Sequence, residues 1–325
     1  MTIEATEGPR VSVIVTFFNQ EQWVDQALDS VAAQTEQSYQ LIVADDGSTD
    51  GTRDRSQAWR VRHGQLGELV FPESNGGLPA LLNLALPLLR GQFVMVLNGD
   101  DWLDPQRLQH QADALEHAPL SVGLVYSDLR VVDLDGKPTG AVFPPLELGR
   151  PEGHLLASLI SGPLFGMPCV MFRRSILEAI GPWDEALIAD DFDFLLRVAA
   201  AGFEFAYAPF TDTNYRQYGT SLTGSRNAAL ADGRIAALLK IRGRDPATDR
   251  LIDRRVGGLA IALHSAGYDL PTTRRRLRQA VRNHPTKRVI RATIESHLRI
   301  RSGRLSLRRV KRLRTDDSLG PFSKS

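Results

Sequence analysis

Short apolar runs alternate with helical patterns over the first hundred residues, and this alternation limits the chain to few folds. Residues 11–17 form a continuous apolar run, which is typical of a strand buried in a parallel sheet. Similar runs at 41–44, 69–71 and 93–97 are each followed by a polar turn and a segment with helical spacing. Alternating strands and helices predict right-handed β-α-β units. We therefore expect an α/β fold with a Rossmann-like, mostly parallel sheet flanked by helices.

Composition excludes several other classes of protein. Of the 325 residues, 42% are apolar and 24% are charged, a balance typical of globular proteins rather than disordered ones. The single cysteine, Cys169, allows no intramolecular disulfide and no CxxC zinc site. The first residues lack the basic and apolar regions of a signal peptide, and polar residues interrupt the most apolar stretch, 78–97. These features predict a cytoplasmic protein, either free or peripheral on the cytosolic face of a membrane.

Charge divides the chain into an acidic body and a basic end. Residues 1–269 hold 22 Lys and Arg against 35 Asp and Glu, whereas residues 270–325 hold 17 against 3. After about residue 226 the pattern becomes helical and increasingly basic. We therefore expect an α/β domain over 1–225, a helical basic C-terminal extension over 226–315 and a disordered tail over 316–325.

Two acidic pairs follow predicted strands directly: Asp45-Asp46 after the second and Asp100-Asp101 after the fourth. Ligands of open parallel sheets bind at the carboxyl ends of the strands, so both pairs are expected in one crevice. Paired carboxylates suit Mg²⁺ or Mn²⁺, which usually share their ligand shell with substrate phosphates. Alternatively, such residues only cap the next helix or turn. The sequence shows no basic residue next to Asp100 and Asp101, so we expect no cation of the protein beside them.

A third acidic cluster opens the helix predicted over 190–201 and consists of Asp190, Asp191 and Asp193. The helix dipole favours carboxylates in a first turn, which is a purely structural explanation. The functional alternative is a general base. The sequence contains no GxxxxGK[ST], GxGxxG, GxSxG or HExxH motif, which argues against P-loop, dinucleotide-binding, hydrolase and zinc-protease sites.

Five segments carry a resemblance to a known family. In chain order they are VSVIVTFFNQ, LIVADDGSTDGT, ALLNLALPLLRGQFVMVLNGDD, DDFDFLLRVAAAG and YRQYGTSLTG. Together they resemble the family 2 inverting glycosyltransferases of the GT-A fold, over about residues 10–225. The resemblance implies an enzyme that uses a divalent metal and a nucleoside-diphosphate sugar, with UDP- or dTDP-sugars as the first expectation. It also implies a glycan or a lipid-linked acceptor, as in polysaccharide biosynthesis.

The same resemblance assigns roles to residues of the donor site. Thr16 and Asp46 match positions that hold the nucleoside, and Asp46 would accept a hydrogen bond from the base. Asn83 matches a recurrent asparagine on the helix before the metal-binding strand, and we assign it to donor binding. Asp100 and Asp101 match the acidic end of the DxD or DxDD motif, which would bind the ribose and the Mn²⁺ or Mg²⁺ ion on the diphosphate.

Asp191 matches the general base of the family's ED motif, with Asp190 in place of the usual glutamate. Two other positions depart from the family pattern. Asn98 replaces the first aspartate of DxDD, which removes a charge, and Tyr218 stands where a histidine often lies near the metal. We therefore assign no third protein ligand to the metal.

These roles imply a single displacement in which one base activates the acceptor hydroxyl and the metal stabilises the leaving diphosphate. One alternative is a nucleotidyltransferase on a similar sheet, which would usually have a glycine-rich basic loop where Phe17-Phe18-Asn19-Gln20 stands. The other alternative is a catalytically degenerate module that only binds nucleotide sugars, as Asn98 and Tyr218 suggest.

The basic segment 270–314 holds 16 Lys and Arg against one acidic residue, Glu295. Helical spacing predicts an apolar stripe of Val289, Ile290, Ile294 and Leu298. The segment could be a solvated extension that packs on the acidic body, or it could contact an anionic membrane surface. Nucleic acid is the least favoured partner, because the segment has almost no aromatic residues for base stacking.

Overall fold

The computed structural model describes residues 8–146, 149–188, 190–218 and 227–298. Contacts divide the chain into two units: Met1–Leu155 with Leu164–Ser221, and Leu156–Pro163 with Leu222–Ser325. The domain boundary predicted at 225 and the tail predicted over 316–325 lie outside the described residues.

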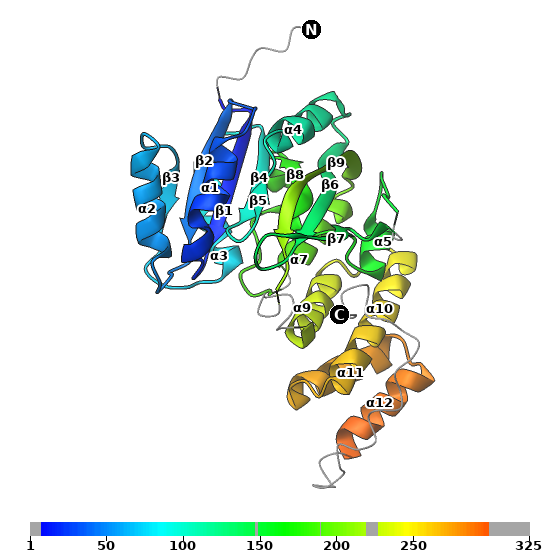
Figure 1. The fold of residues 1–325 in the computed structure, drawn as a ribbon. Coiled ribbons are helices and arrows are strands. Elements are labelled where there is room, and N and C mark those ends of the chain that lie inside the picture. Colours follow the sequence, from blue (N-terminus) through cyan, green and yellow to red (C-terminus); the bar gives the residue numbers. More distant parts are fainter. Residues whose placement is uncertain (1–7, 147–148, 189, 219–226, 299–325) are drawn as a thin grey trace. The chain divides into compact units, whose positions relative to one another are not determined.

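One mixed sheet forms the centre of the first unit (Figure 1). Its strands in the described residues are β1 (Val11–Phe17), β2 (Tyr39–Asp45), β3 (Glu68–Val70), β4 (Phe93–Asn98), β5 (Trp102–Leu103), β6 (Val122–Val132), β7 (Pro138–Phe143), β8 (Val170–Arg173) and β9 (Glu204–Arg216). Their order is β3-β2-β1-β4-β8-β6-β9-β5, with β7 paired to β6. The pairings make β1, β2, β3, β4, β6 and β9 run in one direction and β5, β7 and β8 in the other. The predicted α/β fold with a mostly parallel sheet is therefore confirmed.

Helices cover the faces of this sheet and bury the sides that carry their apolar residues. They are α1 (Val24–Ala32), α2 (Thr52–Arg62), α3 (Leu78–Ala85), α4 (Arg107–His117), α6 (Ile176–Ile180) and α7 (Asp190–Ala200), with short 3₁₀ turns η1 (Glu21–Trp23), η2 (Leu86–Leu88) and η4 (Met167–Cys169). Helix α1 illustrates the rule, because its buried residues Val24, Ala27, Leu28 and Val31 recur at helical spacing. Strand β1 is buried along its whole length, as its continuous apolar run predicts.

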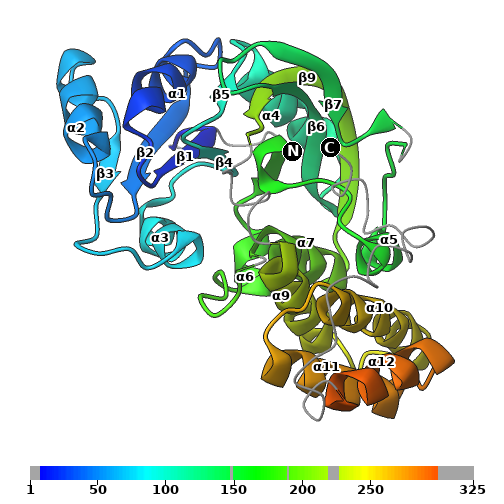
Figure 2. The same cartoon turned by 60° about the horizontal axis from the view of Figure 1, so that its bottom comes forward.

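The register of the parallel strands brings distant loops to one edge. Thr16 near the end of β1 pairs with Ala44 of β2 on one side and Asn98 of β4 on the other. The turns that follow β2 and β4 therefore flank the end of β1, as expected for a ligand site of an open α/β sheet. In Figure 2 this lower edge of the sheet is turned forward, and α3 and α7 lie along it.

The second unit is helical and contains the basic extension, so the predicted C-terminal helices are confirmed. Its helices are α5 (Leu156–Ser161), α9 (Asn227–Lys240), α10 (Pro246–Ser265), α11 (Leu270–Asn283) and α12 (Lys287–Leu298). Asp245 caps α10 by accepting hydrogen bonds from the N–H groups of Ala247 and Thr248. Asp269 caps α11 in the same way, through the N–H of Thr272. Among the described residues, no helix combines the length and the apolarity needed to cross a bilayer.

The apolar stripe predicted on the last helix is divided between two faces. Val289 is 2% exposed and packs inward, where a Cβ on Gly257 would lie only 3.3 Å from one of its methyl groups. Ile290 and Ile294 are 41% and 55% exposed. Positions 289 and 290 lie about 100° apart around a helix, which is enough to separate a buried face from an exposed one.

Candidate active site

The segment from Asn98 to Asp101 forms a tight turn at the carboxyl end of β4. The N–H of Asp101 donates to the carbonyl of Asn98 at 3.0 Å. Gly99 is the residue that permits the turn, because a Cβ there would lie 2.1 Å from Cδ1 of Phe17. The glycine between the polar residues therefore lets the turn sit directly against the end of β1.

Asp101 is buried in this turn and is bonded to the main chain of β9. It is 1% exposed, and its Oδ1 accepts a 2.8 Å hydrogen bond from the main-chain N–H of Arg216 at the end of β9. Its Oδ2 is buried and has no hydrogen-bond partner in the described part of the chain. A buried carboxylate oxygen without a partner is costly, and it is suited to receive a cation.

Asp100 lies beside it and is held by an aromatic hydroxyl. Its Oδ2 accepts a 3.0 Å hydrogen bond from the hydroxyl of Tyr218, whose ring packs against Trp23 with 5.4 Å between centroids. Burial raises the pKa of Asp100, against the opposing effects of this hydrogen bond and of a nearby arginine. Burial and the charge of Asp100 raise the pKa of Asp101 well above its usual value. The two carboxylates thus repel each other in a site that a positive ion would stabilise.

Arg216 lies directly beside the acidic pair, so the expectation that no cation of the protein accompanies it is wrong. Its Nε donates to the main-chain carbonyl of Asp100 at 2.9 Å, and its Nη2 donates to Oε1 of Gln26 at 2.7 Å. A third hydrogen bond joins Nη1 to the carbonyl of Leu134 at 2.5 Å. Because the guanidinium binds carbonyl and amide oxygens, it positions the turn without neutralising either carboxylate directly.

Two tryptophan rings contact the same guanidinium. The Arg216 carbon Cζ lies 5.3 Å from the ring centroid of Trp23 and 5.0 Å from that of Trp102. Cation–π contacts of this kind are strongest where water is excluded, and Arg216 is 3% exposed. The segment around Tyr218 belongs to the family resemblance, but the sequence alone indicates no role for Arg216, because its hydrogen-bond partners lie far from it in the chain.

In the first acidic pair, Asp45 and Asp46 are both buried but have different hydrogen-bond partners. Asp45 is fully buried, accepts hydrogen bonds from the N–H and the hydroxyl of Ser48, and lies 3.3 Å from a guanidinium nitrogen of Arg53. For Asp45 the alternative of a turn-capping role is therefore the correct one.

Asp46 holds the loop that leads to α3. Its Oδ1 accepts from the N–H of Gly76 and its Oδ2 from the N–H of Gly77, each at 2.9 Å. The neighbouring Gly47 has φ +68°, and a Cβ there would lie 2.6 Å from the main chain of the same loop. Thr16 is 6% exposed, with its hydroxyl 3.5 Å from the carbonyl of Leu97. Both predicted nucleoside-binding residues thus lie at the carboxyl edge.

Asn83 of α3 is bonded to the loop that precedes α7. Its side-chain oxygen accepts from the N–H of Trp183 at 2.9 Å, and its nitrogen donates to the carbonyl of the same residue at 3.0 Å. The nitrogen also donates to Glu185 at 2.9 Å. One amide therefore satisfies both main-chain groups of Trp183, whose ring stacks on Phe194 of α7 with 5.0 Å between centroids. This arrangement fixes the entry into α7.

The three aspartates that open α7 have different surroundings. Asp193 is 2% exposed, and its Oδ2 lies 2.8 Å from Nε of Arg197, so it forms a structural ion pair. Burial, and the charges of Asp191 and Asp193, raise the pKa of Asp190 to about 7. Oδ1 of Asp191 accepts the N–H of Phe192 at 2.6 Å. The helix start therefore holds adjacent carboxyl groups, of which Asp190 keeps its proton up to near-neutral pH.

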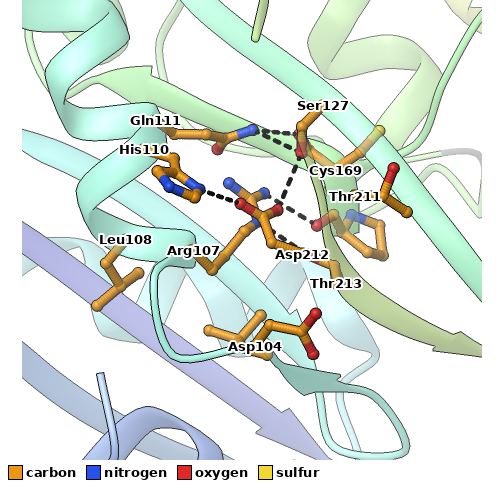
Figure 3. A network of polar contacts seen from close by, with 12 residues as sticks. Asp104, Arg107, Leu108, His110, Gln111, Ser127, Cys169, Thr211, Asp212 and Thr213 are labelled. Atoms are coloured by element: carbon orange, nitrogen blue, oxygen red, sulfur yellow. Dashed lines mark hydrogen bonds and ion pairs between the residues drawn. The ribbon is translucent and has the colours of Figure 1, made fainter. Parts of the chain in front are cut away.

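A buried polar network joins α4 to the strands and to η4 (Figure 3). Arg107, which is fully buried, donates through Nε to the Thr213 hydroxyl at 2.7 Å and lies 3.3 Å from Oδ1 of Asp212. Gln111 donates to the carbonyl of Cys169 at 2.8 Å. The N–H of Asp104, three residues beyond the acidic turn, donates to the carbonyl of Asp212 at 2.8 Å. The network thus fastens the segment after the turn onto β9.

The same network reaches the surroundings of the predicted base. It holds η4, and directly before η4 lies Gly166, where a Cβ would be 3.5 Å from Oδ2 of Asp191. Within the described residues, no three His, Cys, Asp or Glu side chains gather as metal ligands. A metal would therefore be held by the Asp100 and Asp101 pair together with oxygens from a ligand.

Comparisons with known proteins agree with this arrangement of fold and site. Residues 12–181 match the family described as Glycosyl transferase family 2. An uncharacterised glycosyltransferase of Rickettsia typhi is 28% identical over 210 residues, which cover 61% of this chain and 62% of that protein. The chain spans about three fifths of the length of the first curated relatives it matches.

Solved structures show the same fold at low sequence identity. The mannosyltransferase PcManGT from Pyrobaculum calidifontis, in complex with GDP-Man and Mn²⁺, has a TM-score of 0.58 at 23% identity, covering 91% of this chain and 81% of that one. TarS of S. aureus with UDP-GlcNAc has a TM-score of 0.63 at 17% identity, covering 91% and 92%. The fold and its edge of acidic turns define a GT-A-type α/β protein. The chain belongs to glycosyl transferase family 2.

Proposed function

We propose that the protein is an inverting, metal-dependent glycosyltransferase that moves a sugar from a nucleoside diphosphate to an acceptor hydroxyl. The observation that carries the proposal is the turn after β4, where Asp100 is half-buried, Asp101 is buried and Oδ2 of Asp101 lacks a hydrogen-bond partner among the described residues. Two adjacent carboxylates at the carboxyl edge of a parallel sheet are suited to a cation that also binds phosphate oxygens.

The residues present fit a divalent ion. Asp100 and Asp101 would hold Mn²⁺ or Mg²⁺, and the ion would stabilise the charge that develops on the leaving diphosphate. Asn98 and Tyr218 add no charge to this set, so the donor's phosphates are needed to complete the ligand shell. Tyr218 already hydrogen-bonds Asp100, which keeps that carboxylate in place at the turn.

Thr16 and Asp46 are the residues we propose for the nucleoside of the donor. Both lie at the carboxyl edge of the sheet, and both are nearly buried, with exposures of 6% and 5%. A UDP- or dTDP-sugar is the first candidate donor. TarS has been seen with UDP-GlcNAc and UDP, and PcManGT with GDP-Man, so the nucleotide is the variable to test first.

Asp191 is the proposed general base. It stands in the first turn of α7 next to Asp190, whose pKa is raised by burial and by the charges of Asp191 and Asp193. A carboxylate at this position suits removal of a proton from a weak nucleophile. Asp193 is less suited because Arg197 holds it in an ion pair. One base opposite the leaving group gives a single displacement with inversion at the sugar carbon.

The acceptor proposed is a glycan or a lipid-linked hydroxyl on the cytosolic face of a membrane, as in polysaccharide biosynthesis. A degenerate module that binds nucleotide sugars without transfer is the second candidate, and the hydrogen bond from Tyr218 to Asp100 favours it, because it occupies an oxygen of a metal ligand. Hydrolysis of the donor in the absence of acceptor separates the two, since a binding module leaves the donor intact.

A panel of nucleotide sugars, with and without Mn²⁺, tests the proposal. Thermal unfolding should shift upward with one nucleotide class, and more strongly when Mn²⁺ is present. NMR of the released or transferred sugar should then show the anomer opposite to that of the donor. A shift that no metal affects would contradict the metal-dependent part, and a product of unchanged anomeric configuration would contradict inversion.

A further inference from the structure

Helix α11 of the second unit presents three arginine side chains on one exposed side. Arg275, Arg278 and Arg282 recur at intervals of three and four residues and are all exposed, so they lie above one another along the helix. Together with Gln279 and Asn283 they line an open hollow of about 350 Å³. We call the three arginines the arginine face.

The other arginines of α11 are used inside the unit, which makes the arginine face distinct. Nε and Nη2 of Arg274 donate to the carbonyl of Ser296, and Nε of Arg276 lies 2.5 Å from Oδ1 of Asp232. Within the described part of the chain, the arginine face makes neither a hydrogen bond nor an ion pair. Hydrogen bonding lowers the pKa of Asp269, the N-cap of α11, and the charge of Arg275 adds to this effect without forming an ion pair. The three exposed guanidinium groups therefore remain available for an external anion.

Helix α12 exposes apolar side chains between basic ones. Ile290 and Ile294 are 41% and 55% exposed, and they are the exposed large apolar residues in the described part of the second unit. Lys287 and Arg291 are also exposed and lie on the same side of the helix, because the four positions follow the spacing i, i+3, i+4 and i+7. We call these four residues the isoleucine face. It lies opposite buried Val289.

We propose that the arginine face and the isoleucine face bind the surface of a bilayer that contains anionic lipids. Arginine binds phosphate groups in a bidentate manner, and a phospholipid headgroup supplies such a group at high density. Exposed isoleucines one turn apart, flanked by basic residues, are the pattern of a helix that lies in the membrane interface. RNA is less suited, because neither face offers an aromatic ring for stacking.

The charge distribution restricts the contact with an anionic bilayer to the basic part of the chain. Residues 1–269 carry 22 basic against 35 acidic side chains, so most of the chain is repelled by an anionic surface. Binding therefore depends on where the basic residues stand and not on net charge alone. The proposal concerns the second unit and is independent of sugar transfer.

Cosedimentation of the full-length chain with vesicles tests the proposal. Vesicles of phosphatidylcholine are compared with vesicles that also contain phosphatidylglycerol. The variant R275Q/R278Q/R282Q should bind the anionic vesicles at least tenfold more weakly than the wild type. The matched control is R244Q/R250Q/R254Q, which removes three exposed arginines from the same unit outside both faces and should change binding less than twofold. Circular dichroism and thermal unfolding check that both variants are folded.

The isoleucine face is tested by I290S/I294S. At about 0.5 M salt, where exposed charges are screened within a few ångströms, residual vesicle binding should fall in this variant. Equal losses in the two arginine variants would overturn the proposal in favour of unspecific charge attraction. Wild-type vesicle binding by R275Q/R278Q/R282Q would also overturn the proposal. This holds even if the variant binds inorganic phosphate more weakly than the wild type. RNA that displaces the vesicles through the same arginines would overturn it as well.

Discussion

The main-chain N–H of Arg216 donates a 2.8 Å hydrogen bond to Oδ1 of Asp101, a residue 115 positions earlier in the chain. The side chain of the same arginine then returns to the carbonyl of Asp100 at 2.9 Å. The end of β9 therefore sets the geometry of the acidic turn after β4. The rings of Trp23 and Trp102 both contact the guanidinium and help to hold it in place.

Replacement of Arg216 by Gln should destabilise the protein and disorder the acidic turn. Removing a buried cation that satisfies three carbonyl or amide oxygens should lower the free energy of unfolding by about 3–5 kcal/mol. R216K keeps the charge but not the planar fork, and it should recover only part of the loss. Chemical denaturation measures the free energy of unfolding. A Mn²⁺ titration, with nucleotide binding as the readout, measures how well the acidic turn binds the metal. Unchanged values for both would rule out this positioning role.

Replacement of Asp101 by Asn should separate metal binding from stability. Without metal, D101N should be as stable as the wild type or more stable, because it removes the buried one of two adjacent carboxylates and keeps an acceptor for Arg216. With Mn²⁺ and nucleoside diphosphate, the wild-type Tm should rise and that of D101N should not. The control D135N changes an exposed aspartate outside the turn and should respond like the wild type. Chelator that leaves donor binding unchanged would contradict the metal site.

Replacement of Asp191 by Asn should slow transfer while donor affinity holds. General-base assistance contributes about 10²–10⁴-fold, so kcat should fall by that order. D193N provides the comparison: it breaks the ion pair with Arg197 and should lower Tm with a much smaller effect on kcat. Steady-state kinetics and a donor titration measure both variants. Near-normal turnover in D191N would assign the base to another residue, with Asp190 the first to test.

Asp190 should make stability depend on pH. Its pKa is raised to about 7 in the folded protein, whereas an unfolded aspartate ionises near about 4. The folded state therefore holds the extra proton between these values, and stability should fall as pH rises from about 4 to 7. D190N removes this penalty. Its Tm should match the wild type near pH 4 and exceed it by a few degrees at pH 8, measured by calorimetry. A constant difference at all pH values would contradict the shifted pKa.

Replacement of Asn83 by Ala should loosen the entry into α7 rather than the donor site. The variant loses its bonds to both main-chain groups of Trp183, and a loss of about 1–3 kcal/mol in stability follows from such unpaired buried groups. We expect kcat to fall more than donor affinity, because the loop precedes Asp191. Isothermal titration and steady-state kinetics distinguish this from the donor-binding role that the family resemblance implies. A loss of donor affinity with unchanged stability would support the donor-binding role instead.

Local pattern predicted the strands best where it was continuous. The apolar runs of β1 and β8 mark strands at 11–17 and 170–173, as the structure has them. For residues 122–132 the local pattern instead predicts two strands, because Ser127 and Asp128 interrupt the apolar run. They form one strand, β6, since both polar side chains are buried with partners, Tyr207 donating to Asp128 at 3.0 Å and Gln111 donating to Ser127 at 3.2 Å. Those partners lie elsewhere in the chain, where local periodicity cannot reveal them.

The sequence by itself determined the fold class and the edge of the sheet where the acidic residues stand. Strand periodicity and the position of Asp45-Asp46 and Asp100-Asp101 after strands suffice for that, because a parallel sheet gathers the carboxyl ends of its strands. Only the tertiary structure decided what each side chain does there. Arg216 supports the acidic turn, Asp45 stabilises the turn that directly follows it, and Asn83 holds the loop before α7. The first and the last of these contacts join residues about a hundred positions apart, and burial decides their strength, so neither spacing nor composition records them.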